Sequence, residues 1–326
     1  MGEAFGLIIV RPLGLILLWI FKNVGSYGLA VILFALLVKL ICIPLAIKGK
    51  KSMLAMNALN AELQQLQKKY ANNRVKLNEE MQKLYDKHGV NPMTGCLPQF
   101  IPLPIMMGLY YAVQQPLKFM MGFGDDVITK LGAEVGVDMA QAGYYAQITV
   151  AEKLGDIYQS AGGVWPQNIT SITDGMGELL NVDFGFFGLN LAQTPNFREP
   201  SILWLIPILS GATAFLSSFV MQKMQQVKTD NNAAAAQMKM LNLMMPLMSL
   251  WFGFILPGAI GIYWIFNNVF TCLQEIVLTK YLRGKREREE AETAARIEAE
   301  KEAKREANRE RQRQQSQQAK LKKGDK

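Results

Sequence analysis

The run LLVKLICIPL, Leu36 to Leu45, places one lysine inside an otherwise apolar stretch that extends from about residue 26 to residue 47. At about 1.5 Å of rise per residue, a helix of that length crosses a hydrocarbon core roughly 30 Å thick. Lys39 then lies about 13 Å deeper than Lys48, which follows the run. The stretch predicts a membrane-spanning helix and raises the question of what an ammonium group does within it.

The composition also indicates an integral membrane protein. Half of the 326 residues are hydrophobic and fall into long blocks, and the net charge is +8. The three cysteines, Cys42, Cys96 and Cys272, form no CxxC pair, so neither a disulfide framework nor a zinc site is expected. His88 is the only histidine, and the sequence contains no phosphate-binding glycine loop and no GxSxG motif. We therefore expect neither an enzyme nor a cofactor.

Five membrane spans are predicted, over residues 26–47, 96–121, 200–221, 239–256 and 259–280. An earlier apolar stretch, Phe5 to Phe21, is interrupted by Arg11 and Pro12. We expect it to form a helix that lies in the membrane interface, within an N-terminal segment 1–25. A cleaved signal peptide is the alternative, although no small-x-small cleavage site follows it. The predicted fold class is an all-α polytopic membrane protein with a five-helix transmembrane bundle.

The charges of the loops predict the side of the membrane that each loop occupies. Segment 48–92 carries nine Lys or Arg against four Asp or Glu, whereas segment 122–199 carries three against ten. By the positive-inside rule the first is cytoplasmic and the second is an extracytoplasmic insertion. The first two spans with the segment between them make up 26–121, and spans three to five make up 200–281. The basic tail 282–326 also belongs inside, so the N-terminus is outside and the C-terminus is cytoplasmic.

Within the cytoplasmic segment 48–92, residues 53–88 are predicted to form a helical hairpin. Apolar side chains recur every three or four residues before and after a turn at 71–74, namely Met53, Met56, Leu59, Leu63, Leu66 and Tyr70, and then Leu77, Met81, Leu84 and Tyr85. The two stripes should face each other, with a basic outer face in solvent or on anionic lipid. The alternative is that the methionine-rich surface receives varied apolar clients.

The tail 282–326 mixes charges of both signs and lacks aromatic residues. This pattern is typical of a solvated helix or a disordered extension. Its last third retains arginines and lysines while losing most acidic residues, which favours electrostatic contact with phosphate. Ribosomal RNA and the membrane surface are both candidates, and charge alone does not choose between them.

Polar residues recur on one face of several predicted spans. They are Tyr263, Asn267, Thr271 and either Gln274 or Glu275 in the last span, Ser210, Thr213 and Ser217 in the third, Asn242 and Ser249 in the fourth, and Gln99, Tyr110 and Gln114 in the second. A helix bundle without a water-filled cavity would not need so many polar residues on its membrane spans. We expect a water-filled groove, open to the cytoplasm, that hydrates Lys39. The alternative is that Lys39 snorkels, with its ammonium group at the interface.

Three blocks of the sequence carry a family resemblance. VKLICIPL (38–45), HGVNPMTGCLPQFIPLPIMMGLYYAV (88–113) and ILPGAIGIYWIFNNVFTCLQE (255–275) resemble the YidC family of membrane protein insertases. The similarity covers about 26–121 and 199–283. It implies a five-span core with a hydrophilic groove that is open to the cytoplasm and to lipid and carries one basic residue on the first span. Lys39 matches that residue, and Tyr263, Trp264, Asn267 and Asn268 match the groove-side motif of the fifth span.

The resemblance implies an insertase and chaperone of the bacterial cell membrane that moves short polar tails and transmembrane segments of newly made proteins from the cytoplasm into the bilayer. Nascent membrane proteins and lipid are the implied partners, and the ribosome and the Sec translocon are further candidates. The candidate client-binding groove consists of Lys39, Gln99, Ser210, Thr213, Ser217, Asn242, Tyr263, Trp264, Asn267, Asn268, Thr271 and Gln274. No metal ligand and no catalytic residue is expected.

The chain departs from the family pattern in two places that bear on its chemistry. Lys39 stands where most relatives have arginine, and lysine offers a point charge without the bidentate fork. Segment 122–199 is longer than the expected linker, and one or two extra helices are predicted within 125–147.

The sequence leaves two rival functions open. One is a small anion transporter or channel, with Lys39 as the anion site and a path open to both sides. The other is a membrane scaffold.

Overall fold

The computed structural model of the chain describes residues 3–91, 102–225, 240, 244, 246–285, 288, 292 and 298. The chain divides into two compact units, Met1–Ile276 and Val277–Lys326. All contacts described below lie within the first unit. Of the second unit, residues 277–285 are helical, and most of the predicted tail lies outside the described residues.

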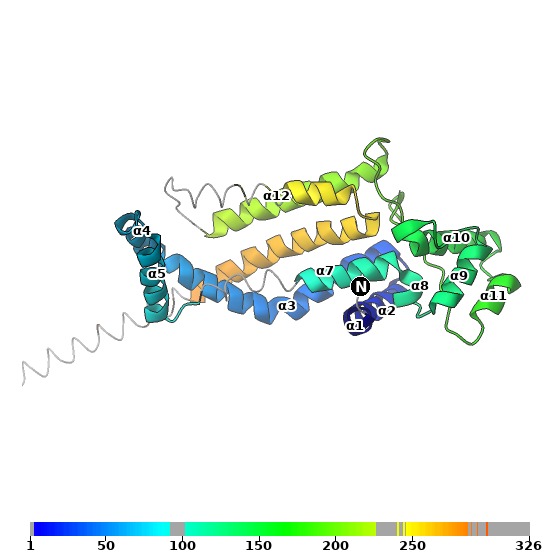
Figure 1. Cartoon of the computed structure of the whole chain (residues 1–326), viewed down its shortest axis with the longest axis horizontal. Coiled ribbons are helices and arrows are strands. Elements are labelled where there is room, and N and C mark those ends of the chain that lie inside the picture. Colours follow the sequence, from blue (N-terminus) through cyan, green and yellow to red (C-terminus); the bar gives the residue numbers. More distant parts are fainter. Residues whose placement is uncertain are drawn as a thin grey trace, which may run out of the picture. The chain divides into compact units, whose positions relative to one another are not determined.

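The described residues are almost entirely helical, which confirms the predicted all-α class (Figure 1). The helices are α1 Glu3–Phe5, η1 Gly6–Val10, α2 Arg11–Val24, α3 Tyr27–Ala58, α4 Asn60–Lys69, α5 Arg74–His88, α7 Pro102–Gln114, α8 Pro116–Phe119, α9 Asp125–Glu134, η2 Gly143–Tyr145, α10 Ala146–Ser160, α11 Gln167–Thr173, η3 Ile202–Trp204 and α12 Leu205–Gln225. Residues 246–253 and 258–285 are also helical. Two short strands, β1 Gly185–Phe186 and β2 Leu189–Asn190, pair antiparallel.

Three of the described helices are long and apolar enough to cross a membrane: Gly6–Val24, Tyr27–Met56 and Ile202–Met224. The last two contain most of the predicted spans 26–47 and 200–221. The predicted span 96–121 begins outside the described residues and continues as α7 and α8, which Pro116 separates. Of the fourth predicted span, the described residues 240, 244 and 246–253 are helical, and the helix ends earlier than expected, at 253. The fifth predicted span lies within 258–285.

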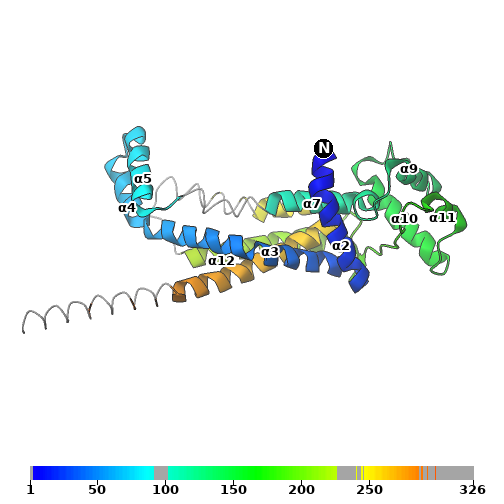
Figure 2. The ribbon, with the colours of Figure 1, turned by 90° about the horizontal axis from the view of Figure 1, so that it is seen from below.

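The N-terminal helix is longer than the sequence suggested. Helical residues run from 3 to 24. Arg11 and Pro12, which interrupt the apolar stretch in the sequence, therefore do not interrupt the helix. The five-residue π-helical segment η1 ends directly before α2, and Pro12 lies in the first turn of α2, where its missing N–H costs little. Gly25, with φ of +72°, ends the helix in a left-handed cap. In Figure 2, α2 runs across α3 and α7 and not along them. Its location in the interface remains a prediction.

The core of the bundle is apolar and tightly packed. Fully buried side chains from α2, α3, α7 and α8 meet in it, among them Leu17, Phe34, Leu109 and Leu117. Glycines bring helices close together, as expected in membrane proteins. A Cβ atom on Gly253 would lie 2.6 Å from Cα of Pro207 in α12.

Side chains on the opposite face of α12 are exposed, namely Ile208, Leu209, Phe215, Leu216 and Phe219. This face is suited to contact with lipid.

Segment 122–199 is a packed structure on the N-terminal end of α3. The ring of Tyr27 meets Phe184 edge to face at 4.9 Å between centroids, and the ring of Phe186 lies against Gly28. Within 125–147, where one or two helices were predicted, the structure has α9, the short helix η2 and the first residues of α10. Beyond this stretch the segment also contains α11 and the β1–β2 hairpin, which were not predicted; α11 has only seven residues and lies among glycine-rich turns, which hide its periodicity.

Tyr27 allows a small test of this packing. Its side chain is fully buried, and its hydroxyl has no hydrogen-bond partner among the described residues. A buried hydroxyl without a partner costs about 1–3 kcal/mol. We therefore expect Tyr27→Phe to leave the thermal midpoint of the purified protein unchanged or to raise it. A lower midpoint would mean that the hydroxyl is bonded after all.

The predicted helical hairpin is present, with a different start. Helix α3 continues to Ala58, so the hairpin consists of α4 and α5. The two apolar stripes face each other, as predicted, and bury Leu59, Leu63, Leu84 and Tyr85 between them. The side chain of Asn73 accepts a hydrogen bond from the backbone N–H of Lys76, at 3.0 Å, and caps α5 after the turn. Burial raises the pKa of Tyr85.

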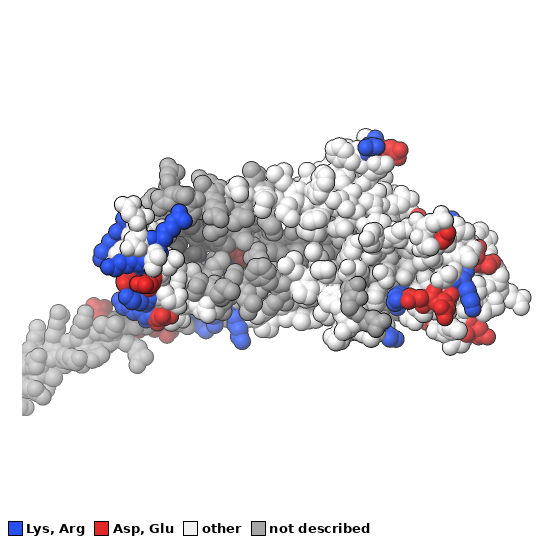
Figure 3. Space-filling view, in the orientation of Figure 1, with Lys and Arg blue, Asp and Glu red and all other residues white. Residues whose placement is uncertain are grey.

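Charged side chains gather at two places on the face shown in Figure 3. One lies over the α4–α5 hairpin and is mainly basic, and the other lies over the α9–α11 segment and is mainly acidic. The described surface over α12 shows few charges. A basic region and an acidic region at separate places on the surface are the pattern expected of a protein whose ends lie on opposite sides of a membrane.

Candidate functional site

Lys39 lies on α3 and reaches the helix over 258–285. Its Nζ donates a hydrogen bond to Oγ1 of Thr271 at 2.8 Å, and this hydroxyl donates in turn to the backbone oxygen of Asn267 at 2.6 Å. The lysine side chain is half-buried. The structure therefore joins three of the predicted site residues in one chain of hydrogen bonds between the first and last membrane helices.

Three contacts show that α3 and the last helix run in the same direction. Phe34 packs against Tyr263 with ring centroids 6.5 Å apart, Lys39 bonds to Thr271, and Lys50 pairs with Glu275. Phe34 and Tyr263 lie at the same height in the bundle, and both helices rise about 1.5 Å per residue, so Lys39, five residues after Phe34, lies opposite residue 268. The lysine therefore leans about 4–5 Å toward the hairpin end of the bundle to reach Thr271. The lysine side chain thus extends along the helix axis and ends at a polar partner on the last helix.

A second polar cluster lies on the other side of the last helix. Nδ2 of Asn268 donates to the backbone oxygen of Ser210 at 3.5 Å and to Oγ1 of Thr213 at 3.4 Å. The hydroxyl of Ser210 donates to the backbone oxygen of Ser249 at 3.5 Å. Ser217 is also buried, at 8% exposure. The polar stripe of α12 therefore faces the protein interior.

The remaining predicted site residues have different surroundings. Tyr263 is buried against Phe34, whereas Trp264 stacks on Phe252 with ring centroids 5.8 Å apart. Gln274 is half-buried. Gln99 and Asn242 lie outside the described residues. The contacts thus join the predicted residues into two groups, one between α3 and the last helix and the other between the last helix and α12.

The structure adds one ion pair that the sequence analysis did not single out. Nζ of Lys50 pairs with Oε1 of Glu275, and the two side chains are 4% and 12% exposed. The signal that could have found Lys50 is its spacing of eleven residues from Lys39, which brings both lysines to one face of a continuous helix. It was counted with the loop charges because the span was expected to end near residue 47.

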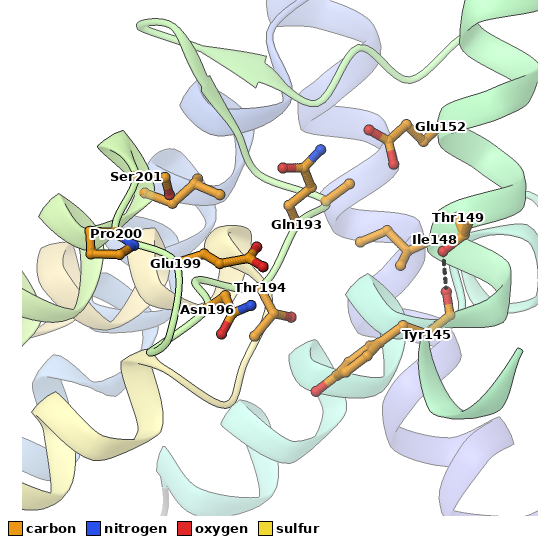
Figure 4. Close-up of a pocket in the computed structure, with 12 residues that line it drawn as sticks. Tyr145, Ile148, Thr149, Glu152, Gln193, Thr194, Asn196, Glu199, Pro200 and Ser201 are labelled. Carbon is orange, nitrogen blue, oxygen red and sulfur yellow. Dashed lines mark hydrogen bonds between the residues drawn. The ribbon is translucent and has the colours of Figure 1, made fainter.

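A pocket of about 490 Å3 lies between α10 and the loop that leads into η3 (Figure 4). Polar side chains line it: Thr149, Glu152, Gln193, Thr194, Asn196, Glu199 and Ser201. The loop holds the start of the last helix, because the backbone N–H of Gly258 donates to the oxygen of Gln193 at 2.9 Å. The pocket contains none of the predicted site residues. Among the described residues, no group of three or more His, Cys, Asp or Glu is arranged to hold a metal ion.

Comparison with known proteins places this architecture in a family. Residues 19–286 match the family model of the 60Kd inner membrane protein. Membrane protein insertase YidC 2 of Listeria innocua is 29% identical over 90% of this chain and 77% of its own length. YidC 1 of Halalkalibacterium halodurans is 31% identical over 83% of this chain and 77% of its own length. YidC of Oceanobacillus iheyensis is 26% identical over 82% of both chains.

Proposed function

The chain belongs to the 60Kd inner membrane protein family, and we propose that it inserts newly made proteins into the membrane by moving short polar tails and transmembrane segments out of the cytoplasm. The relatives described above are named membrane protein insertases, and three described helices can cross a membrane. The proposed activity involves no covalent chemistry. The residues proposed to contact the client are those of the two polar groups around the last helix.

The observation that carries the proposal is the cation inside the bundle. Lys39 lies within an apolar helix, and its bond is to the hydroxyl of Thr271. A hydroxyl does not neutralise an ammonium group. A lysine at the centre of a span costs about 2.5–3.5 kcal/mol on insertion scales. A partly hydrated groove would lower that cost and would leave the charge available to an acidic client.

The proposed mechanism lowers the barrier to moving charged groups across the bilayer. Charged side chains near the bilayer centre each cost several kcal/mol when they cross unaided. In our proposal the acidic N-terminal tail of a client pairs transiently with Lys39 while its apolar helix moves along the lipid-facing side of the groove. The membrane potential would then draw the negative tail outward, at about 2.3 kcal/mol per charge per 100 mV.

We further propose a bacterial cell membrane location with the N-terminus outside and the C-terminus in the cytoplasm. The basic hairpin and the acidic segment 122–199 support this orientation. Nascent membrane proteins and lipid are the proposed partners, and contact of the basic tail with the ribosome and work beside the Sec translocon are further proposals. Client proteins whose membrane spans have long or highly charged flanks should need a larger translocation channel than this groove.

Solvent access to the last helix tests the groove. In a background with serine at positions 42, 96 and 272, Asn267→Cys and Thr271→Cys should react with membrane-impermeant thiol reagents from the cytoplasmic side only. Leu273→Cys is the matched control, because Leu273 is on the same helix and 55% exposed but apolar and suited to face lipid. We expect little or no labelling at 273. Labelling is measured in sealed vesicles of both orientations.

The other labelling patterns support the rival functions. Labelling of positions 267 and 271 from both sides indicates a path through the membrane, as in an anion channel or transporter with Lys39 as its site. Absence of labelling from either side indicates a closed bundle, as in a scaffold. Either result contradicts the proposed insertase groove.

A further inference from the structure

The ion pair between Lys50 and Glu275 is unusual for its position. Lys48, Lys50 and Lys51 lie within one turn of α3, and only Lys50 is buried. Its side chain is 4% exposed and Glu275 is 12% exposed, so both charges are withdrawn from solvent. Ion pairs buried in this way add little stability over apolar side chains of similar size, because desolvation offsets the attraction. Stability alone is therefore a weak reason for this pair.

Lys50 and Lys39 lie along the same seam between two helices. Eleven residues correspond to about three turns, so the Cα atoms of the two lysines are within roughly 20° of each other around α3 and about 16 Å apart along it. Their partners, Glu275 and Thr271, are one turn apart on the last helix. An acidic segment that enters from the hairpin end would meet Lys50 first and Lys39 second.

The two lysines differ in the kind of partner that the chain provides. Lys39 bonds to a hydroxyl, whereas Lys50 bonds to a carboxylate. That carboxylate is the same chemical group as an Asp or Glu side chain in a client tail. Glu275 thus occupies Lys50 in the way that a client's acidic residue would.

We propose that Lys50 is a second client-binding cation at the entrance of the groove and that Glu275 is an internal competitor which a client carboxylate replaces. This inference rests on the proposed insertase function and deepens it by naming a specificity determinant. No covalent bond changes: the ion pair between Lys50 and Glu275 is exchanged for one between Lys50 and the client. Because Glu275 must be displaced, the pair sets how acidic a tail must be to enter.

The test compares two clients in liposomes that contain the full-length protein. Both clients have one span and the same N-terminal tail, except that Asp and Glu in one tail are Asn and Gln in the other. The quantity measured is the ratio of their initial insertion rates, acidic over neutral. Glu275→Gln should raise this ratio about threefold, and Lys50→Gln should lower it about threefold, because one ion pair is exchanged for another and only the difference between them changes the rate. Lys48→Gln, which removes an exposed charge from the same turn, should change the ratio less than either.

The opposite changes expected in the insertion-rate ratio, a rise for Glu275→Gln and a fall for Lys50→Gln, distinguish client binding from a purely structural role of the ion pair. If both variants lower insertion of the two clients alike, or shift the ratio in the same direction, the pair only holds the helices together and the inference is wrong. A rise with Glu275→Gln cannot come from misfolding, and Lys50→Arg, which keeps the cation, should keep the ratio of the unchanged protein. If the unchanged protein inserts neither client faster than empty liposomes, it is the proposed function that fails.

Discussion

Lys39→Ala is expected to reduce insertion of a single-span client with an acidic N-terminal tail by at least about tenfold in liposomes that contain only the purified protein. The variant removes the ammonium group that bonds to Thr271 in the seam between α3 and the last helix. An acidic tail would then cross the bilayer core without a compensating charge. The measurement is the fraction of client whose tail becomes protected from protease outside the vesicle.

Two further variants show which property of Lys39 matters. Lys39→Arg keeps the positive charge and should retain most of the insertion, since arginine also donates to a hydroxyl. Lys39→Gln keeps a donor and loses the charge, so it should resemble alanine if the charge is required. A client with an uncharged tail is the control and should depend less on Lys39.

Equal insertion by Lys39→Ala and the unchanged protein would contradict this role. Lys39 would then be a snorkelling or hydrating residue. The insertase function would have to rest on water in the groove and on local thinning of the bilayer, and the hydroxyl and amide groups around Thr213 and Asn268 would become the residues to test.

The sequence was sufficient to predict those features that depend on local periodicity. Apolar runs of the right length identified α3 and α12, and spacings of three and four identified the facing stripes of the hairpin. The polar residues on α12 were also placed on one face, and Ser210 and Ser217 are buried there. Each of these predictions needs only the geometry of a single helix.

What the sequence did not predict depends on how helices rotate against each other. Thr271 and Asn268 lie three residues apart on one helix, yet Thr271 accepts a hydrogen bond from Lys39 on α3 and Asn268 donates one to Thr213 on α12. Consecutive residues in a helix point about 100° apart, and no local pattern says which neighbour each will meet. The choice is made by side-chain packing between residues far apart in the chain, such as Phe34 and Tyr263.

Lys50 was missed for a related reason. Three lysines in four residues normally mark the end of a membrane span. Here α3 continues to Ala58, and the regular helix turns Lys50 toward Glu275 while Lys48 and Lys51 stay in solvent. The position of a charge in a membrane protein therefore follows from the length of the helix that carries it as much as from its neighbours in sequence.

Gly253→Ala is expected to cause the largest loss of stability of any single methyl addition in the contact between α12 and the helix over 246–253. The new Cβ would lie 2.6 Å from Cα and 2.7 Å from Cβ of Pro207, and the backbone of a packed helix cannot move away as a side chain can. Overpacking of this kind costs about 1–3 kcal/mol, against a gain of at most about 1 kcal/mol from helix propensity. The measurement is the thermal midpoint of the purified protein in detergent, which should fall.

Gly108→Ala is the matched control, because it is the same change in another helix, α7. The Cβ at this position would lie 2.5 Å from Cδ1 of Leu13, the flexible end of a side chain that can change rotamer. This variant should therefore lose less stability than Gly253→Ala, or none. If both variants unfold at the same temperature, the approach of the helix backbones at Gly253 is not what holds this part of the bundle together. If only the midpoint of Gly253→Ala falls, the close approach of the two helix backbones at Gly253 and Pro207 is what stabilises this contact.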